Sequence, residues 1–203
     1  MTHSLLPYFQ KKWIEAGCDE AGRGCLAGPV VAAAVILPLN FRNALLDDSK
    51  KMSEKDRFEL EPIIKEKALA YAVGIVDHLT IDKINILNAS FLAMHRAVEQ
   101  LKLIPELLLI DGNRFKKYPS IEHFCIIKGD GKYKSIAAAS VLAKVHRDRL
   151  METYHEKFPQ YGWNQNKGYP TEQHRKAIKA HGACELHRLS FTLLKPEQLK
   201  LSF

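Results

Sequence analysis

The sequence predicts an α/β domain in which one mixed β-sheet is covered by helices. Short apolar runs of strand length end at glycines or acids, whereas longer segments carry apolar residues at helical spacing. No internal repeat or linker interrupts the chain, and 203 residues that are 46% hydrophobic suffice for one core. We therefore expect a single domain over residues 1–203, with a core of about 14–190 and a tail of 191–203.

Five segments are predicted to contain strands. They are WIEAGCDE (13–20), PVVAAAVIL (29–37), ALAYAVGIV (68–76), PELLLIDGN (105–113) and HFCIIKGDGKY (123–133). Three glycines in GRGCLAG separate the first two strands. The second strand is apolar throughout, which is typical of a strand buried on both faces.

Helices are predicted between and after these strands. One begins near Ser53, which precedes Asp56 by three residues in a variant of the capping box. Thr80 or Asp82 can begin a short helix, and Asn88 can cap the helix that follows it.

The last third of the chain is predicted to be mainly helical. A long helix begins at Ser135, and its first two turns consist of small residues. A loop over 159–170, PQYGWNQNKGYP, leads to a last helix that begins at Thr171.

Four carboxylates stand where apolar strands stop, and they are Asp19, Glu20, Asp111 and Asp130. Strand ends in α/β folds gather catalytic groups, and a buried carboxylate needs a partner or a cation. Oxygen ligands without His or Cys clusters suit Mg²⁺ or Mn²⁺, and two such ions about 4 Å apart can promote phosphodiester cleavage. A single acid–glycine pair is more often a turn, so the prediction depends on all four acids together.

The charge and the cysteines restrict the class of protein. The net charge is +7, and residues 112–149 hold nine basic and three acidic side chains, which suits nucleic acid or a lysine-rich soluble surface equally. No apolar run is long enough for a membrane span, and the N-terminus has no secretory pattern. The four cysteines lack CxxC spacing, so we expect reduced thiols and a cytoplasmic location.

Five blocks of sequence together resemble the ribonuclease HII family, bacterial type. They are CDEAGRGCLAGPVVAAAVIL, DDSKKMS, LLLIDGN, KGDGKYKSIAAASVLAKVHRDRLM and NKGYPTEQH. The resemblance implies a ribonuclease H-like mixed five-stranded sheet flanked by helices, with a helical C-terminal extension. It also implies an endonuclease that cleaves RNA in RNA–DNA hybrids and incises at single ribonucleotides in duplex DNA. The implied products carry a 5′-phosphate and a 3′-hydroxyl.

The same resemblance assigns residues to roles. Asp19, Glu20, Asp111 and Asp130 match the four metal-binding acids, for two Mg²⁺ or Mn²⁺ ions. The backbone of Gly22, Arg23 and Gly24 matches the motif that reads the ribose 2′-hydroxyl, the group that distinguishes RNA from DNA. Tyr169 matches the tyrosine that packs on the deoxyribose after the ribonucleotide. The phosphate contacts implied are Lys50, Ser140, Lys144 and Arg147, of which the last three share one helix face.

Several alternatives remain open from the sequence. One alternative is ribonuclease HIII, which usually carries an extra N-terminal domain. Another is a catalytically inactive nucleic-acid-binding module, but such a module would gain nothing from four acids near phosphate. His146, His155 and His174 lack metal-ligand spacing and are expected to be surface or satisfied groups. The end of the chain, EQLKLSF, is similar to sliding-clamp peptides, but its apolar residues could instead pack on the domain's own core. We expect a monomer.

Overall fold

The structure, a computed structural model, describes residues 5–47 and 52–194 of the chain. Its sheet has the order β3-β2-β1-β4-β5, in which β1 runs antiparallel to β2 and parallel to β4. The strands are β1 (Glu15–Ala21), β2 (Val30–Ile36), β3 (Ala70–Val76), β4 (Leu107–Asp111) and β5 (Glu122–Ile126). The mixed five-stranded sheet predicted from the sequence is confirmed.

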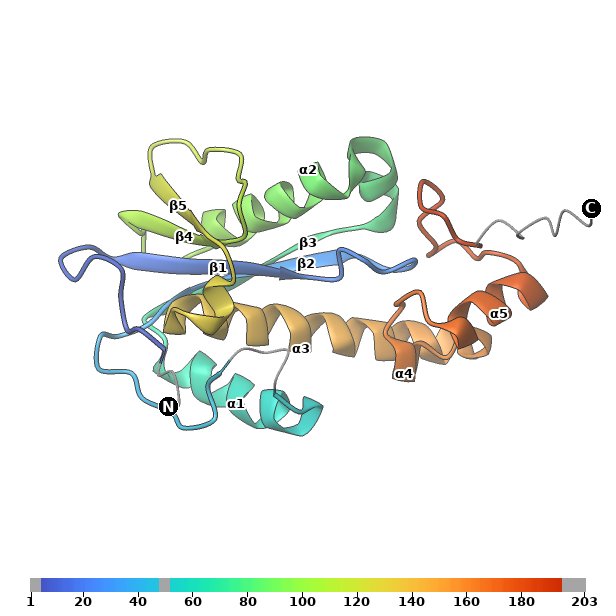
Figure 1. Cartoon of the computed structure of the whole chain (residues 1–203), viewed down its shortest axis with the longest axis horizontal. Coiled ribbons are helices and arrows are strands. Elements are labelled where there is room, and N and C mark those ends of the chain that lie inside the picture. The colour runs from blue at the N-terminus through green and yellow to red at the C-terminus, as the bar shows by residue number, and fades with distance from the viewer. Residues whose placement is uncertain (1–4, 48–51, 195–203) are drawn as a thin grey trace, which may run out of the picture.

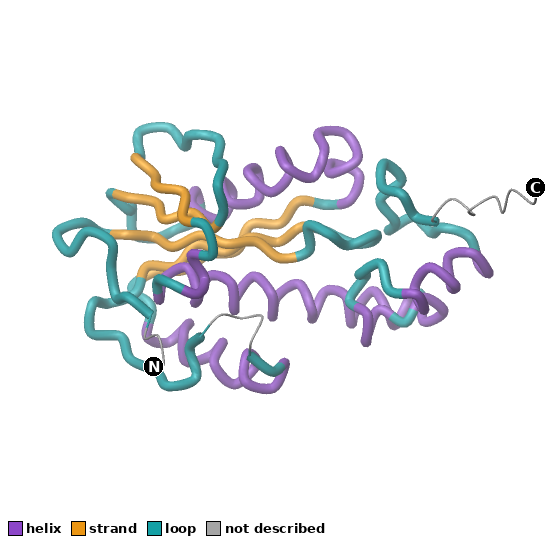
Figure 2. Tube along the Cα trace, viewed as in Figure 1, coloured by secondary structure: helices purple, strands orange, loops and turns teal. Residues whose placement is uncertain are grey.

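Helices cover both faces of this sheet. The helices are α1 (Glu54–Lys67), α2 (His78–Glu99), α3 (Lys134–Lys157), α4 (Trp163–Asn166) and α5 (Glu172–His181), with short 3₁₀ turns η1 (Gly129–Gly131) and η2 (Pro159–Tyr161). Figure 1 shows α2 on one side of the sheet and α1 with α3 on the other. In Figure 2 the strands form one layer between these helices.

The central strands are buried on both faces, as their apolar sequences predict. Every residue of β2 is buried, and its alternate side chains enter the two core clusters on either side of the sheet. Glycine permits close helix packing at two points. A Cβ on Gly17 would lie 2.2 Å from the Ser135 backbone of α3, and one on Gly74 would lie 2.0 Å from Ala93 O of α2. Each helix therefore packs directly against the sheet backbone.

Two predicted helix starts differ from the structure. The predicted capping box at Ser53 and Asp56 is present, but the helix expected from Thr80 or Asp82 begins one turn earlier, with Asp77 as its N-cap. Asp77 is the N-cap because its carboxylate accepts the Thr80 N–H at 2.7 Å.

The cap predicted at Asn88 is also wrong. Asn85 caps instead, because its Oδ1 accepts the Asn88 N–H, at a kink where Asn85 has φ +65°. Asparagine tolerates this left-handed region better than most residues.

The C-terminal helices form a small extension beyond the end of the sheet, beside the last turns of α3 (Figure 1). Its core combines Tyr161, Trp163 and Ile178 with Leu26 and Met151 of the main body. The predicted helical C-terminal extension is therefore present, and it is fixed to the segment between β1 and β2. Within the described residues, none of the helices has the length and hydropathy needed to span a membrane.

Candidate active site

Three of the predicted carboxylates meet where β1 and β4 end. The parallel pairing of Cys18 with Ile110 brings Asp19 beside Asp111, and η1 carries Asp130 to the same point. One carboxylate oxygen from each of Asp19, Asp111 and Asp130 lies within 4.8 Å of the others. The neighbouring Gly129 N–H donates to Asp111 Oδ1 at 2.7 Å. The fold therefore gathers acids that are far apart in the sequence.

The environment of Asp19 disfavours its ionised form. Its side chain is buried, and burial raises the pKa of Asp19 well above its usual value. The nearby charges of Glu20 and Asp111 raise this pKa further. Hydrogen bonds from the Ser140 side chain and the Glu20 N–H, the latter 2.7 Å from Asp19 Oδ1, oppose the rise.

The cluster opens into a cavity of about 440 Å³. Its lining combines acids, a glycine turn, cations and one aromatic ring, from Asp19, Glu20, Ala21, Gly22, Arg23, Gly24, Arg57, Asp111, Ser140, Lys144 and Tyr169. Glu20 faces this cavity and pairs with Arg23, 3.1 Å away. Asp130 is buried and does not line it. The cavity therefore contains most of the residues predicted for the site.

Lys144 of α3 places a positive charge at the cavity wall. Its Nζ is paired with Asp148 at 2.5 Å and lies 5.7 Å from the centre of the Tyr169 ring. The Lys144 side chain keeps 23% of its surface exposed, so it stays accessible from the cavity. Lys50 lies outside the described residues.

Arg147 does not have the accessibility that a phosphate contact needs. Its side chain is fully buried, and its guanidinium donates to the carbonyls of Ala27, Pro29 and Lys167. The helix face was predicted correctly, but the segment between β1 and β2 covers the last of its three residues. Gly22 has φ +95°, and a Cβ there would lie 2.0 Å from Arg147 Nε, so only glycine fits.

Two further arginines at the site were not predicted from the sequence. Arg57 lines the cavity from α1, and its Nη1 donates to Met52 O at 2.6 Å. Arg188 is fully buried behind the glycine turn, and burial is the main cause that lowers its pKa to about 10. Arg188 therefore remains charged at neutral pH.

Tyr169 is held by a buried network on the C-terminal extension. His174 Nδ1 lies 2.9 Å from Tyr169 O, and Trp163 Nε1 donates to His174 Nε2 at 3.0 Å. The expectation that His174 is a satisfied group is confirmed. Its neighbours show that it supports the Tyr169 loop, a role that spacing in the sequence did not indicate.

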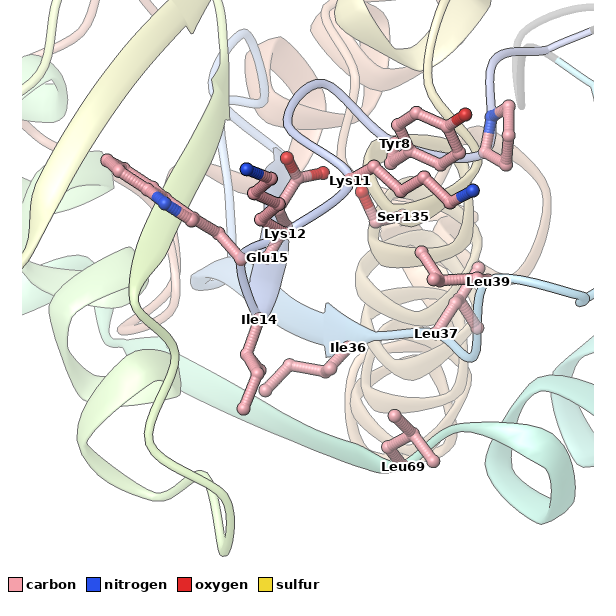
Figure 3. Close-up of a pocket in the computed structure, with 12 residues that line it drawn as sticks. Tyr8, Lys11, Lys12, Ile14, Glu15, Ile36, Leu37, Leu39, Leu69 and Ser135 are labelled. Carbon is pink, nitrogen blue, oxygen red and sulfur yellow. The ribbon is translucent and has the colours of Figure 1, made fainter.

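A second cavity, of about 220 Å³, lies at the opposite end of β1 (Figure 3). Figure 3 shows Glu15 beside Lys12, with Tyr8 and Leu39 across the cavity. The Glu15 carboxylate already accepts the backbone N–H groups of Phe9 and Gln10. Among the described residues, Asp19, Asp111 and Asp130 form the one group of potential metal ligands, so this second cavity is not the acidic site.

The donor set fits a hard divalent cation. All three clustered ligands are carboxylates, which suit Mg²⁺ or Mn²⁺ better than softer ions. A cation would also stabilise the ionised form of buried Asp19, which burial and two neighbouring acids disfavour.

Comparison with known proteins identifies the family. The family model described as Ribonuclease HII matches residues 16–194. The chain is 63% identical to Ribonuclease HII of Bacteroides thetaiotaomicron, over 98% of this chain and all of that protein.

Two archaeal structures share the fold. The RNase HII in the PCNA:RNase HII complex from Archaeoglobus fulgidus superposes with a TM-score of 0.74 at 28% identity, covering 92% of this chain and 98% of that one. Ribonuclease H2 from Pyrococcus horikoshii superposes with a TM-score of 0.72 at 26% identity, covering 88% and 94%. The matched region contains the acid cluster, the glycine turn and Tyr169, and the chain belongs to the ribonuclease HII family of hydrolytic nucleases.

Proposed function

We propose that this ribonuclease H hydrolyses the RNA strand of RNA–DNA hybrids and incises at ribonucleotides embedded in duplex DNA. The products are a 5′-phosphate and a 3′-hydroxyl. The observation that carries the proposal is the grouping of Asp19, Asp111 and Asp130 within 4.8 Å, next to a cavity that also exposes a glycine turn and Tyr169. A metal-dependent nuclease with a ribose-reading turn needs these parts together.

We assign the metal-binding role to Asp19, Glu20, Asp111 and Asp130. Two Mg²⁺ or Mn²⁺ ions held by these carboxylates would activate the attacking water and stabilise the leaving oxygen. The protein's own contribution is to keep Asp19 and Asp111 aligned on the ends of paired strands. Ser140 adds a hydrogen bond to Asp19, which favours the ionised carboxylate.

The substrate-binding roles follow the cavity wall. The backbone of Gly22, Arg23 and Gly24 reads the 2′-hydroxyl, and Tyr169 packs on the deoxyribose that follows the ribonucleotide. Lys144 binds phosphate together with Ser140 and Lys50, although Lys50 lies outside the described residues. Arg147 is left out of the phosphate contacts, because its donors are occupied by three carbonyl groups.

We further propose that the enzyme acts as one domain and as a cytoplasmic monomer, and that its tail docks on a sliding clamp. The four free cysteines suit a reducing compartment. The tail residues Gln198, Leu199, Leu201 and Phe203 lie outside the described residues. Support for docking comes from their resemblance to clamp-binding peptides and from the Archaeoglobus RNase HII, which was solved in complex with PCNA.

One assay tests the catalytic proposal. A duplex with a single ribonucleotide, an identical all-DNA duplex and a long RNA–DNA hybrid are incubated with Mg²⁺, with Mn²⁺ and with a chelator. We expect cleavage of both ribonucleotide-containing substrates with either metal, and none of the all-DNA duplex. Cleavage that persists in the chelator, or that ignores the ribonucleotide, would contradict the proposal.

A further inference from the structure

Two arginines are buried without a carboxylate partner behind the glycine turn. Arg147 of α3 and Arg188 of the C-terminal segment have no exposed surface, and neither forms an ion pair with any residue that the structure describes. Burying a charge in this way is costly unless its hydrogen-bond donors are satisfied. Their partners should therefore show what the arginines are for.

All of these partners are backbone carbonyls of loops that border the cavity. Arg188 donates from Nη1 to Arg23 O, from Nε to Gly28 O and from Nη2 to Pro29 O, at 3.0, 3.0 and 3.1 Å. Arg147 shares Pro29 O, at 3.0 Å from its Nε. It also reaches Lys167 O, two residues before Tyr169, at 2.7 Å. The two guanidinium groups thus join the glycine turn to the Tyr169 loop.

The bond to Arg23 O fixes the direction of one peptide group. The described chain contains no cis peptide, so the Gly24 N–H points opposite to the Arg23 carbonyl. Because that carbonyl points to Arg188, the Gly24 N–H points away from the buried guanidinium. Gly24 lines the cavity, and apart from its chain neighbours no atom lies within 4 Å of the position where its Cβ would be. The space beside Gly24 is therefore open.

We infer that Arg188 is a positioning residue for ribonucleotide recognition, because it holds the Arg23–Gly24 peptide with its N–H turned toward the ribose 2′-hydroxyl. This inference rests on the proposed function, which assigns 2′-hydroxyl recognition to the Gly22–Gly24 backbone. It adds the side chain that orients that backbone from behind, from a segment far away in the sequence.

Asp82 of α2 supports Arg188 in turn. Its carboxylate accepts the N–H groups of Leu189 and Ser190, at 2.8 and 3.1 Å, and the Ser190 hydroxyl at 2.5 Å. These bonds fix the backbone next to Arg188. Asp82 does not line the cavity. Its replacement should therefore loosen Arg188 without removing any group from the cavity wall.

The test uses the full chain with Mg²⁺ or Mn²⁺ and the variants Arg188→Lys and Arg188→Met. Two constants are measured, kcat/KM on the single-ribonucleotide duplex and the inhibition constant of an all-DNA competitor. Lysine keeps the charge but cannot reach three carbonyls at once, so we expect kcat/KM to fall about 3- to 10-fold, as for one lost hydrogen bond. Methionine should lower it further. The inhibition constant of the DNA competitor should change less than about twofold, because the phosphate contacts are untouched.

Two further variants separate positioning from folding. Asp82→Ala should also lower kcat/KM on the single-ribonucleotide duplex more than it changes the inhibition constant of the DNA competitor. This variant keeps the inference testable if the Arg188 variants fail to fold. Arg175→Met is the matched control, because Arg175 also donates to two carbonyls of the C-terminal segment, Thr192 O and Leu193 O, but does not touch the glycine turn. This control should leave both kcat/KM and the inhibition constant unchanged.

The outcomes can be told apart. A folded Arg188→Lys enzyme with wild-type kcat/KM, or equal losses in both constants, would overturn the inference while leaving the proposed function intact. A wild-type enzyme that cleaves without regard to the ribonucleotide would instead overturn the proposed function.

Discussion

The Nε2 atoms of His174 and His187 lie 3.3 Å apart in the core of the C-terminal extension. The hydrogen-bond partners of each ring show which of its two nitrogens carries the proton. The Cys184 N–H donates to His187 Nδ1, so the His187 proton is on Nε2. His174 Nε2 accepts from Trp163, so its proton is on Nδ1 and is donated to Tyr169 O. Both rings are therefore neutral in this network.

Stability should fall in mild acid because this pair must stay neutral. Burial is the main cause that lowers the pKa of His187, from 6.5 to about 4, and burial also lowers the pKa of His174. Between those values the unfolded chain binds a proton that the folded chain does not, so the free energy of unfolding decreases as the pH falls from about 6.5 to 4. His187 alone accounts for about 3 kcal/mol across this range.

Urea unfolding at several pH values between 7 and 4.5 measures this loss. His187→Asn removes the depressed group, so its stability should depend less steeply on pH, whatever its stability at pH 7. His181→Gln alters an exposed histidine at the end of α5 and serves as the control. An unchanged pH slope in His187→Asn would show that the histidine pair is not the acid-sensitive element.

The acid cluster should be essential for cleavage but not for folding. Asp19→Asn or Asp111→Asn removes charge that holds the cation, so cleavage should fall by several orders of magnitude. In a chelator the melting temperature should stay the same or rise, because like charges around Asp19 repel. Divalent cations should raise the melting temperature of the wild type more than that of either variant.

Glu122→Gln is the control for these substitutions, since Glu122 is an exposed acid on β5 that pairs with Lys117. It should keep both cleavage and the metal-induced stabilisation. Near-normal cleavage by a folded Asp111→Asn enzyme would rule out the proposed mechanism.

The strand ends show what can be predicted from this sequence. Apolar runs that stop at Asp19 and Asp111 already predicted that these acids stand at strand ends and belong to one metal site, because strand period and burial are encoded locally. Asp130 followed from the same pattern. The helix boundaries were predicted less well. Asp77 and Asn85 act as caps because each accepts a local backbone N–H, and several neighbouring polar residues were equally suitable for this role.

The buried arginines show where sequence patterns stop being informative. Spacing correctly placed Arg147 on one helix face with Ser140 and Lys144. It could not show that residues 27–29 and 167 close over that face, because those contacts depend on how distant segments meet. Arg188 had no periodic signal at all. Its role appears only when the carbonyls of the glycine turn are counted as partners.

Tyr169 should matter most at the junction between RNA and DNA. Tyr169→Ala removes the ring beside Lys144, and losing a stacking platform costs about 1–3 kcal/mol, so cleavage at a single ribonucleotide should slow roughly 5- to 150-fold. Tyr169→Phe keeps the ring and should stay close to wild type. If Tyr169→Ala cleaves both the embedded ribonucleotide and the long hybrid at wild-type rates, the assignment of Tyr169 is wrong.

Deletion of residues 197–203 separates the two roles open to the tail. A clamp-docking peptide inserts a few apolar anchors into a groove on its partner, so its loss should abolish clamp binding and leave the melting temperature and the cleavage of free duplex unchanged. A tail that covers the domain's own core would instead lower the melting temperature when removed.

The double variant Leu201→Ala, Phe203→Ala should reproduce the deletion in a pull-down with the sliding clamp, whereas Lys200→Ala should bind normally. A full-length enzyme that shows no clamp binding at micromolar concentration would exclude docking, whatever the melting temperature of the deletion variant.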